Sequence, residues 1–176
     1  MNPYQYEDKL ESERLITRML HIDDIKAWEV FFESPEATAY IPKYNSTDKK
    51  VKARGMIEKQ LLRYETKRYG LQVLTDKKTN QFVGICGLLL QDIEGHEQIE
   101  IGYHLFKQFW GKGYATEAAK LFKHYAFSNN LCDSVISIID IHNIRSQKVA
   151  MNNGMTREKQ LHWAEHDIYI YRVNKN

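Results

Sequence analysis

Cysteine, proline and long uncharged hydrophobic runs are all scarce in this chain of 176 residues. Its two cysteines, Cys86 and Cys132, are too few for a disulfide framework and too far apart for a paired metal-ligand motif, so we expect a reducing compartment, the cytoplasm. The first eight residues contain neither a basic nor an apolar leader region, and no stretch is long enough to cross a bilayer. The sequence therefore predicts neither export nor a membrane partner.

An excess of charge of one sign is also lacking. The 25 Lys and Arg residues nearly balance the 23 Asp and Glu residues, which leaves a net charge of +2 and no broad basic field for a nucleic-acid duplex. Aromatic residues interleaved with Lys and Arg could stack on RNA bases, but they form no such cluster and fit core positions better. We therefore expect no nucleic-acid partner.

Hydrophobic residues make up 43% of the chain, which is enough for one core. The three prolines all precede residue 43, and no linker, charge block or repeat interrupts the sequence. We therefore expect a single domain over residues 1–176. On general grounds an isologous homodimer is the commonest oligomer of such a chain.

Hydrophobic periodicity predicts an α+β domain around one mostly antiparallel sheet. Strands are expected at residues 14–20, 69–74, 82–90, 99–106, 135–139 and 168–173. Helices are expected at residues 23–34, 46–64, 115–129 and 145–153. The first helix should stop before Pro35, and Gly154 should cap the last one. The turn over residues 76–80 should join its two flanking strands into a hairpin.

The most informative segment is a strand that passes through a turn containing Gly111 and Gly113 directly into a helix. The two glycines can adopt conformations closed to other residues, so that consecutive backbone N–H groups point into one concavity near the positive end of the helix. Such a nest binds phosphate, although this spacing fits a merely tight turn equally well. The spacing excludes a Walker loop, and the missing third glycine excludes the dinucleotide fingerprint.

Further motifs accompany this loop in a fixed order along nearly the whole chain. They are Glu13-Arg14-Leu15 with Arg18, Glu100-Ile101-Gly102-Tyr103, the block from Gln108 to Ala118, and Asn143-x-x-Ser146 followed by Asn153-Gly154-Met155. Together they resemble the GNAT superfamily of N-acetyltransferases, in particular the RimJ/RimL branch of ribosomal-protein alanine acetyltransferases, with spermidine acetyltransferases as relatives. The resemblance implies a GNAT-like sheet, mixed and mostly antiparallel, splayed in a V and flanked by helices.

The resemblance also implies acetyl-CoA as co-substrate and no metal. Backbone amides of the glycine loop would hold the coenzyme A pyrophosphate, while the strand before the loop and two polar residues beyond the next strand would hold the pantetheine arm. The implied cofactor-binding residues are Tyr103, His104, Leu105, Gln108, Trp110, Gly111, Lys112, Gly113, Tyr114, Ala115, Thr116, Asn143 and Ser146. From the residue types alone, Asn143 and Ser146 would be ordinary helix-cap residues.

Acyl transfer to an amine needs a neutral amine, a stabilised oxyanion and a protonated or stabilised thiolate. Glu100 lies on the strand that lines the implied gap, and burial that raises its pKa would let it accept the ammonium proton. A purely structural role for this carboxylate is equally consistent with the sequence. Strand alternation places Glu100 and His104 on one face and Tyr103 and Leu105 on the other.

The leaving-group acid is the point at which the chain departs from many relatives. They carry a tyrosine four residues before the late glycine, where this chain has Ala150. Ser146 becomes the best remaining proton donor, and a thiol leaving group is weakly basic, so loss of a strong acid need not abolish turnover. The departure leaves a second hypothesis, a non-catalytic acyl-CoA-binding or regulatory module of the same fold.

The acceptor is expected to be a primary amine, either a protein N-terminus or a small molecule such as a polyamine, an amino acid or an antibiotic. Residues 33–44, 91–98 and 160–166 should decide between them. Residues 162–166 also match the H-x-x-E-H zinc motif in their letters. That motif needs a helix and a distant third ligand, whereas only ten residues follow here and they predict a strand. We therefore expect surface histidines or part of the acceptor pocket, and no metal site.

Overall fold

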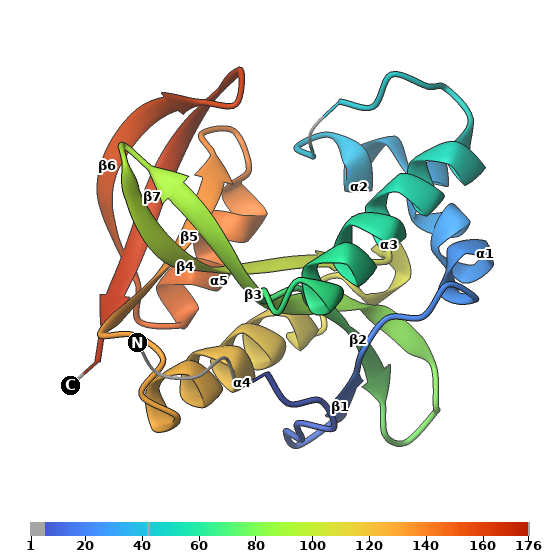
Figure 1. Cartoon of the computed structure of the whole chain (residues 1–176), viewed down its shortest axis with the longest axis horizontal. Coiled ribbons are helices and arrows are strands. Elements are labelled where there is room, and N and C mark those ends of the chain that lie inside the picture. The colour runs from blue at the N-terminus through green and yellow to red at the C-terminus, as the bar shows by residue number, and fades with distance from the viewer. Residues whose placement is uncertain (1–5, 42, 176) are drawn as a thin grey trace.

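The computed structural model describes residues 6–41 and 43–175, and these contain a seven-stranded sheet with the order β1-β2-β3-β4-β5-β7-β6. The strands are β1 (Leu15–Arg18), β2 (Leu71–Asp76), β3 (Phe82–Ile93), β4 (His96–Leu105), β5 (Ser134–Asp140), β6 (Thr156–Trp163) and β7 (His166–Asn174). Neighbouring strands are antiparallel except β4 and β5, which run parallel and pair within the described residues only at Glu100 and Ile136. The sheet therefore splits at this point, as the predicted splayed α+β fold requires (Figure 1).

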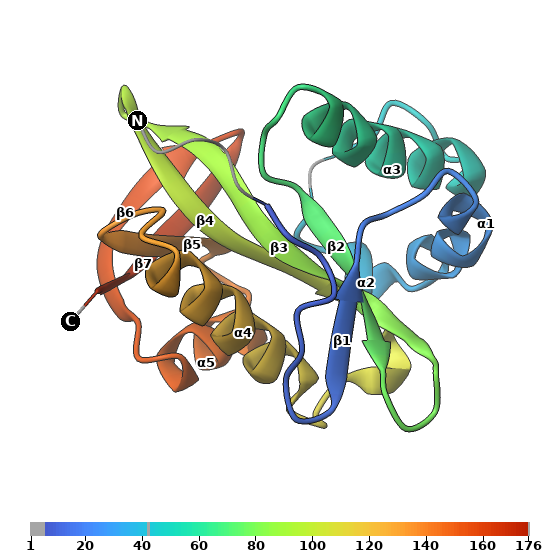
Figure 2. The ribbon, with the colours of Figure 1, turned by 60° about the horizontal axis from the view of Figure 1, so that its bottom comes forward.

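Helices cover both faces of the sheet. They are α1 (Asp24–Trp28), α2 (Pro35–Thr38), α3 (Lys49–Glu65), α4 (Tyr114–Ser128) and α5 (Ile144–Asn152), with 3-10 turns η1 (Glu29–Glu33) and η2 (Lys107–Phe109). Figure 2 shows α3 and α1 on one face of β2, β3 and β4, and α4 on the other. None of the helices in the described residues is both long and apolar enough to cross a membrane. The first five residues, in which we expected no leader, and Pro42 lie outside the described residues.

Trp28 ties the helices of one face to the sheet. Its side chain is fully buried, and its ring stacks on those of Phe31 and Phe82 at centroid distances of 4.6 and 5.7 Å. The indole N–H donates to the sulfur of Met56 in α3 at 3.1 Å. One side chain thus joins α1, η1, α3 and β3, and burial of its large apolar area stabilises their arrangement.

The predicted helices and strands are confirmed, with shifted ends, but two expectations were wrong. The helix expected over residues 23–34 is divided into α1 and η1, and Pro35 begins a further helix, α2, which Ser34 caps by accepting from the N–H of Ala37 at 3.3 Å. Strand β6 was not predicted. It is an edge strand whose side chains are mostly polar and exposed, so it lacks the apolar alternation of a core strand.

We expect the change Trp28→Ala to lower the free energy of unfolding by about 3–5 kcal/mol, because it removes a fully buried aromatic ring from a packed cluster. Urea unfolding followed by circular dichroism measures the loss. Val30→Ala, on the adjoining turn with 53% of the residue exposed, is the control and should change stability by no more than about 0.5 kcal/mol. Equal losses in the two variants would contradict the anchoring role of Trp28.

Candidate active site

A cavity of about 690 Å³ passes through the split between β4 and β5. Its wall includes residues 100–105 of β4, residues 137–140 of β5, the turn before α4 and the start of α5. On the other face of the sheet the wall continues along α3. Most residues that the sequence predicts for a cofactor and a base therefore face one continuous space.

The main chain of β4 turns its polar groups alternately toward β3 and toward the split. Ser137 Oγ, from β5, donates to the carbonyl of Ile101 at 3.1 Å, so the main-chain groups of Ile101 face β5. By alternation those of Tyr103 and Leu105 also face the split, whereas those of His104 face β3. The carbonyl of Leu105 accepts from the indole N–H of Trp110 at 2.9 Å. The N–H groups of Tyr103 and Leu105 and the carbonyl of Tyr103 are left facing the open part of the split.

The side chains of β4 lie on the faces expected from alternation. The Tyr103 hydroxyl donates to the carbonyl of Ser146 in α5 at 3.3 Å, and burial raises the pKa of this phenol. His104 lies on the opposite face, where its ring packs edge-on against Phe31 at 5.7 Å. Burial lowers the pKa of His104 to about 4, so its imidazole is neutral at pH 7.

The glycine loop has the conformation that a phosphate nest needs. Gly111 and Gly113 both have positive φ, 73° and 82°, and α4 begins directly after them. The first hydrogen bond of the helix runs from the N–H of Glu117 to the carbonyl of Gly113. In the described part of the chain, the N–H groups of residues 113–116 donate to no acceptor, and these residues line the cavity. These amides are therefore available to an anion.

An ion pair from the distant Glu13-Arg14-Leu15 motif holds this loop in place. Glu117 Oε1 accepts from the backbone N–H of Arg14 and from Ser12 Oγ, each at 2.7 Å, and Glu117 Oε2 accepts from Arg14 Nε at 2.7 Å. Arg14 Nη1 donates to the carbonyl of Lys112 at 2.9 Å, and the guanidinium lies 4.3 Å from the ring centre of Tyr114. Burial acts to raise the pKa of Glu117, but the hydrogen bonds from Ser12 and Arg14 outweigh it and keep this pKa below its usual value.

The remaining predicted cofactor residues divide into two groups. Asn143 and Ser146 line the cavity, but Asn143 Oδ1 accepts from the N–H of Ser146 at 3.1 Å and so also caps α5. Gln108 and Lys112 are exposed and lie outside the cavity wall. Two cations that the sequence did not single out, Arg145 and Lys148, do line it. The guanidinium of Arg145 lies 5.0 Å from the ring centre of Trp110, beside the glycine loop.

Glu100 is buried in the cavity wall with 9% of the residue exposed. Burial raises the pKa of its carboxyl, against the hydrogen bonds from Gln91 and from the Ile138 N–H and against the charge of Arg63. Gln91 Nε2 donates to Glu100 Oε2 at 2.7 Å. Sequence reasoning missed this partner, although the β3–β4 turn signal could have located it. That turn pairs Leu89 with Glu100 and places Gln91 diagonally opposite the carboxylate.

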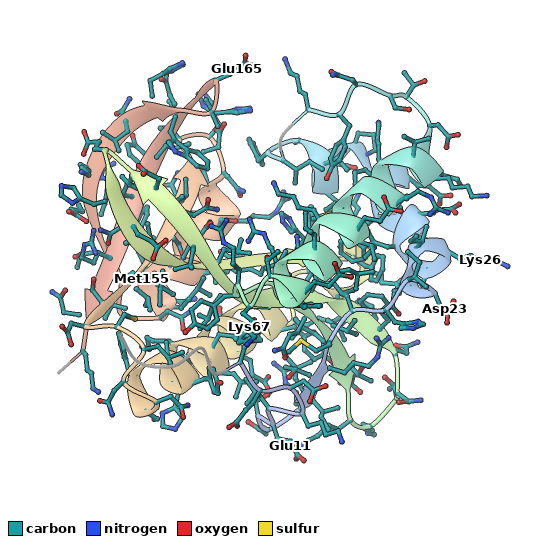
Figure 3. The ribbon with its side chains drawn as sticks, viewed as in Figure 1. Glu11, Asp23, Lys26, Lys67, Met155 and Glu165 are labelled. Atoms are coloured by element: carbon teal, nitrogen blue, oxygen red, sulfur yellow. The ribbon has the colours of Figure 1, made fainter. Side chains whose placement is uncertain are left out.

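The H-x-x-E-H letters lie on a hairpin and not on a helix. Ala164 and Glu165 form its tip with positive φ values of 48° and 66°, and Figure 3 shows Glu165 at the outer end of the molecule. His162 Nδ1 lies 2.9 Å from Asp167 Oδ1, while His166 Nδ1 lies 3.4 Å from Asp140 Oδ2. Within residues 6–41 and 43–175 no group of three side chains is placed to hold a metal ion. Ala164 and His166 instead line the cavity.

We expect Glu117→Gln to destabilise the protein by about 1 kcal/mol at pH 7, since it weakens a partly exposed ion pair. The folded-state pKa of Glu117 is depressed, so its contribution is present above the unfolded pKa and is lost as pH falls through the folded one. Urea unfolding from pH 7 down to pH 3 should show the two proteins converge in stability at low pH. The exposed Glu97, changed to Gln, is the control, and a difference independent of pH would contradict the ion pair.

Comparison with known proteins agrees with these features. The family model described as "Acetyltransferase (GNAT) domain" matches residues 14–156. The chain is 30% identical to YkkB of Bacillus subtilis over 166 residues, which cover 93% of this chain and 94% of YkkB. It is 28% identical to the N-acetyltransferase p20 of Bacillus licheniformis over 177 residues, which cover 96% of this chain and 97% of p20.

Solved structures share the fold. An acetyltransferase from Agrobacterium tumefaciens superimposes with a TM-score of 0.79 and 24% identity over 99% of each chain. RimL, a ribosomal L7/L12 alpha-N-protein acetyltransferase in complex with coenzyme A, does so with a TM-score of 0.72 and 17% identity over 93% of this chain and 95% of RimL. With the family match over residues 14–156 and the split sheet beside a glycine loop, the chain belongs to the GNAT superfamily of N-acetyltransferases, as its motifs predicted.

Proposed function

We propose that this protein transfers the acetyl group of acetyl-CoA to a primary amine by direct attack. The observation that carries the proposal is the cavity through the sheet. It joins unbonded amides at the start of α4 to a buried carboxyl, Glu100, on the acceptor side. A thioester in the split would then lie between its binding groups and a base. The reducing environment expected from Cys86 and Cys132 fits a cytoplasmic enzyme.

The residues along the split fit coenzyme A as substrate. The amides of residues 113–116 and the positive end of α4 would bind its pyrophosphate, and Arg145 and Lys148 add positive charge nearby. Tyr103 and Leu105 would hydrogen-bond the pantetheine amides as an added strand does, and Asn143 would contact the same arm. The related RimL structure contains coenzyme A, which supports this assignment.

Glu100 is the proposed base. Its raised pKa suits proton transfer from an ammonium group, directly or through water, and the neutral amine then attacks the thioester carbon. A main-chain N–H of Tyr103 or Leu105 would polarise the carbonyl oxygen as charge develops on it. The carbon–sulfur bond breaks as the amide bond forms, and the thiolate accepts a hydrogen bond from Ser146 Oγ and takes its proton from solvent. The Tyr103 hydroxyl lies on the same wall, where it donates to the carbonyl of Ser146 and so helps to position this residue.

A second candidate function is a non-catalytic acyl-CoA-binding module of the same fold. Ala150, at the position of the usual acid, is buried with 2% exposed and supplies no proton. This module would bind acetyl-CoA and release no thiol with any amine. Among acceptors of an active enzyme, a protein N-terminus and small amines such as polyamines or antibiotics are the alternatives. The RimL-like neighbours favour the N-terminus, and no nucleic acid is required.

We expect Glu100→Gln to lower kcat by roughly 10²–10⁴-fold, because a positioned base of shifted pKa is removed. The wild-type rate should rise with pH through the raised pKa of Glu100, since only the carboxylate accepts a proton, and the variant should lack this rise. Thiol release from acetyl-CoA with a panel of amines measures both effects. Glu97→Gln on the same strand is the matched control. An unchanged pH profile in Glu100→Gln would contradict the assignment of Glu100 as the base.

We expect Gly113→Ala to weaken coenzyme A binding by about tenfold to a hundredfold, because loss of the nest costs charge-assisted hydrogen bonds. Alanine at this position would have to keep the positive φ of 82°, which strains any residue with a Cβ, and the added Cβ would lie 3.3 Å from the Arg14 guanidinium. Gly95→Ala is a close control, since Gly95 has φ of 80° with no atom within 4 Å of the added Cβ. Calorimetric titration with coenzyme A should separate the two variants. Equal affinities would show that the loop does not hold the pyrophosphate.

A further inference from the structure

One face of α3 lines the acceptor side of the cavity. Met56, Lys59, Gln60 and Arg63 follow one another at helical spacing, and all four belong to the cavity wall. Gln60 Oε1 accepts from the backbone N–H of Leu71 at 2.9 Å and is buried, which fixes the rotation of the helix. The positions of Lys59 and Arg63 at the cavity are therefore set by packing.

These two cations have no anionic partner. In the described residues neither Lys59 nor Arg63 donates a side-chain hydrogen bond or forms an ion pair, whereas Lys49 and Arg54 of the same helix pair with Glu33 and Glu58. Arg63 is half-buried and Lys59 is exposed at the rim. Burial lowers the pKa of both, and the charge of Arg63 lowers that of Lys59 further. Partly desolvated positive charges without a partner favour binding of an anion.

The acidic side chains of the cavity do not neutralise them. Glu36 pairs with Lys107 at 2.5 Å, and Asp140 Oδ2 lies 3.4 Å from His166 Nδ1. Glu100 accepts from Gln91, and it acts on Arg63 only through longer-range attraction. The acceptor side therefore combines one buried carboxyl with two unpaired cations on the adjoining helix.

The cofactor phosphates do not explain these cations. The free amides of the glycine loop and the cations Arg145 and Lys148 belong to α4, α5 and the turn before α4. Figure 2 shows α3 on the opposite face of the sheet from α4. An anion held by α3 is thus a group of the acceptor and not of coenzyme A.

We propose that the acceptor is an amine that carries a carboxylate or phosphate group, which Arg63 and Lys59 hold while the amine lies at Glu100. The proposal rests on the acetyltransferase function proposed above and narrows its substrate class. The opposite charges of acceptor and site orient the molecule, because its ammonium is attracted to Glu100 and its anion to α3. Polyamines, which lack an anion, would place positive charge beside two unpaired cations and are disfavoured.

Matched pairs of amines that differ in one anionic group test this proposal. The pairs are β-alanine against β-alaninamide, O-phosphoethanolamine against ethanolamine, and the peptide amides Ala-Glu against Ala-Gln, with spermidine as a cationic reference. We expect at least one anionic member to exceed its neutral partner about tenfold or more in kcat/KM, as a charge-assisted contact implies. The responding pair also identifies whether the anion comes from a carboxylate, a phosphate or an acidic peptide. Equal rates within every pair, or preference for spermidine, would overturn the proposal.

Arg63→Gln should abolish this preference, so that the two members of each pair react at rates within about threefold of one another. Lys50→Gln is the matched control, since it removes one positive charge from an exposed site on α3 outside the cavity wall. It should keep the preference of the unchanged protein. A preference retained in Arg63→Gln, or lost equally in both variants, would contradict the assigned contact.

An equilibrium measurement separates this proposal from the proposed function. Each amine is titrated calorimetrically into the protein saturated with coenzyme A, so that no reaction is needed. Anionic amines should bind at least about tenfold more tightly than their partners, and Arg63→Gln should remove the difference. Such binding without thiol release would contradict the proposed catalytic function and support the anion site. Thiol release without any charge preference in binding would support the catalytic function and contradict the anion site.

Discussion

The arrangement of this site depends on the separation of β4 from β5. Two adjacent parallel strands normally bond along their length, yet here only Glu100 and Ile136 pair within the described residues. The Ser137 hydroxyl takes the place of a ladder bond to the carbonyl of Ile101 at the point of divergence. Beyond it, main-chain groups of β4 are left without a strand partner. Backbone groups left open in this way favour an extended ligand that restores the missing bonds.

The split between β4 and β5 could bind coenzyme A only together with a glycine loop held in a fixed conformation at its end. Gly111 and Gly113 allow the backbone to turn its amides toward the cavity, but glycine is also the most flexible residue in an unfolded loop. Arg14 and Glu117 supply the missing rigidity, because they connect the loop and the first turn of α4 to the segment before β1. A contact between residues a hundred positions apart thus fixes the proposed phosphate site before any ligand binds.

Local sequence patterns predicted the helices, strands and turns in which a single sequence feature, such as apolar periodicity or a turn motif, determines the structure. The amphipathic helices, the β2–β3 hairpin and the raised pKa of the Glu100 carboxyl followed from periodicity, turn residues and strand position. Strand β6 could not be found in this way, because its polar edge has no apolar repeat and its Ala164-Glu165 tip lacks Gly or Asn. The proposed role of Arg63 could not be predicted from the sequence either. An arginine on a helix surface becomes a candidate for substrate binding only when the fold places it near Glu100 without an ion-pair partner.

The charges on the acceptor side connect recognition with proton transfer. Burial raises the pKa of Glu100, while the nearby charge of Arg63 opposes this shift. An anion bound to Arg63 would offset that charge, while the ammonium of the same acceptor, beside Glu100, would act in the opposite direction and favour the carboxylate. The carboxylate is then maintained until the ammonium gives up its proton to it. The same unpaired cation can therefore select the acceptor and place its amine at the group that activates it.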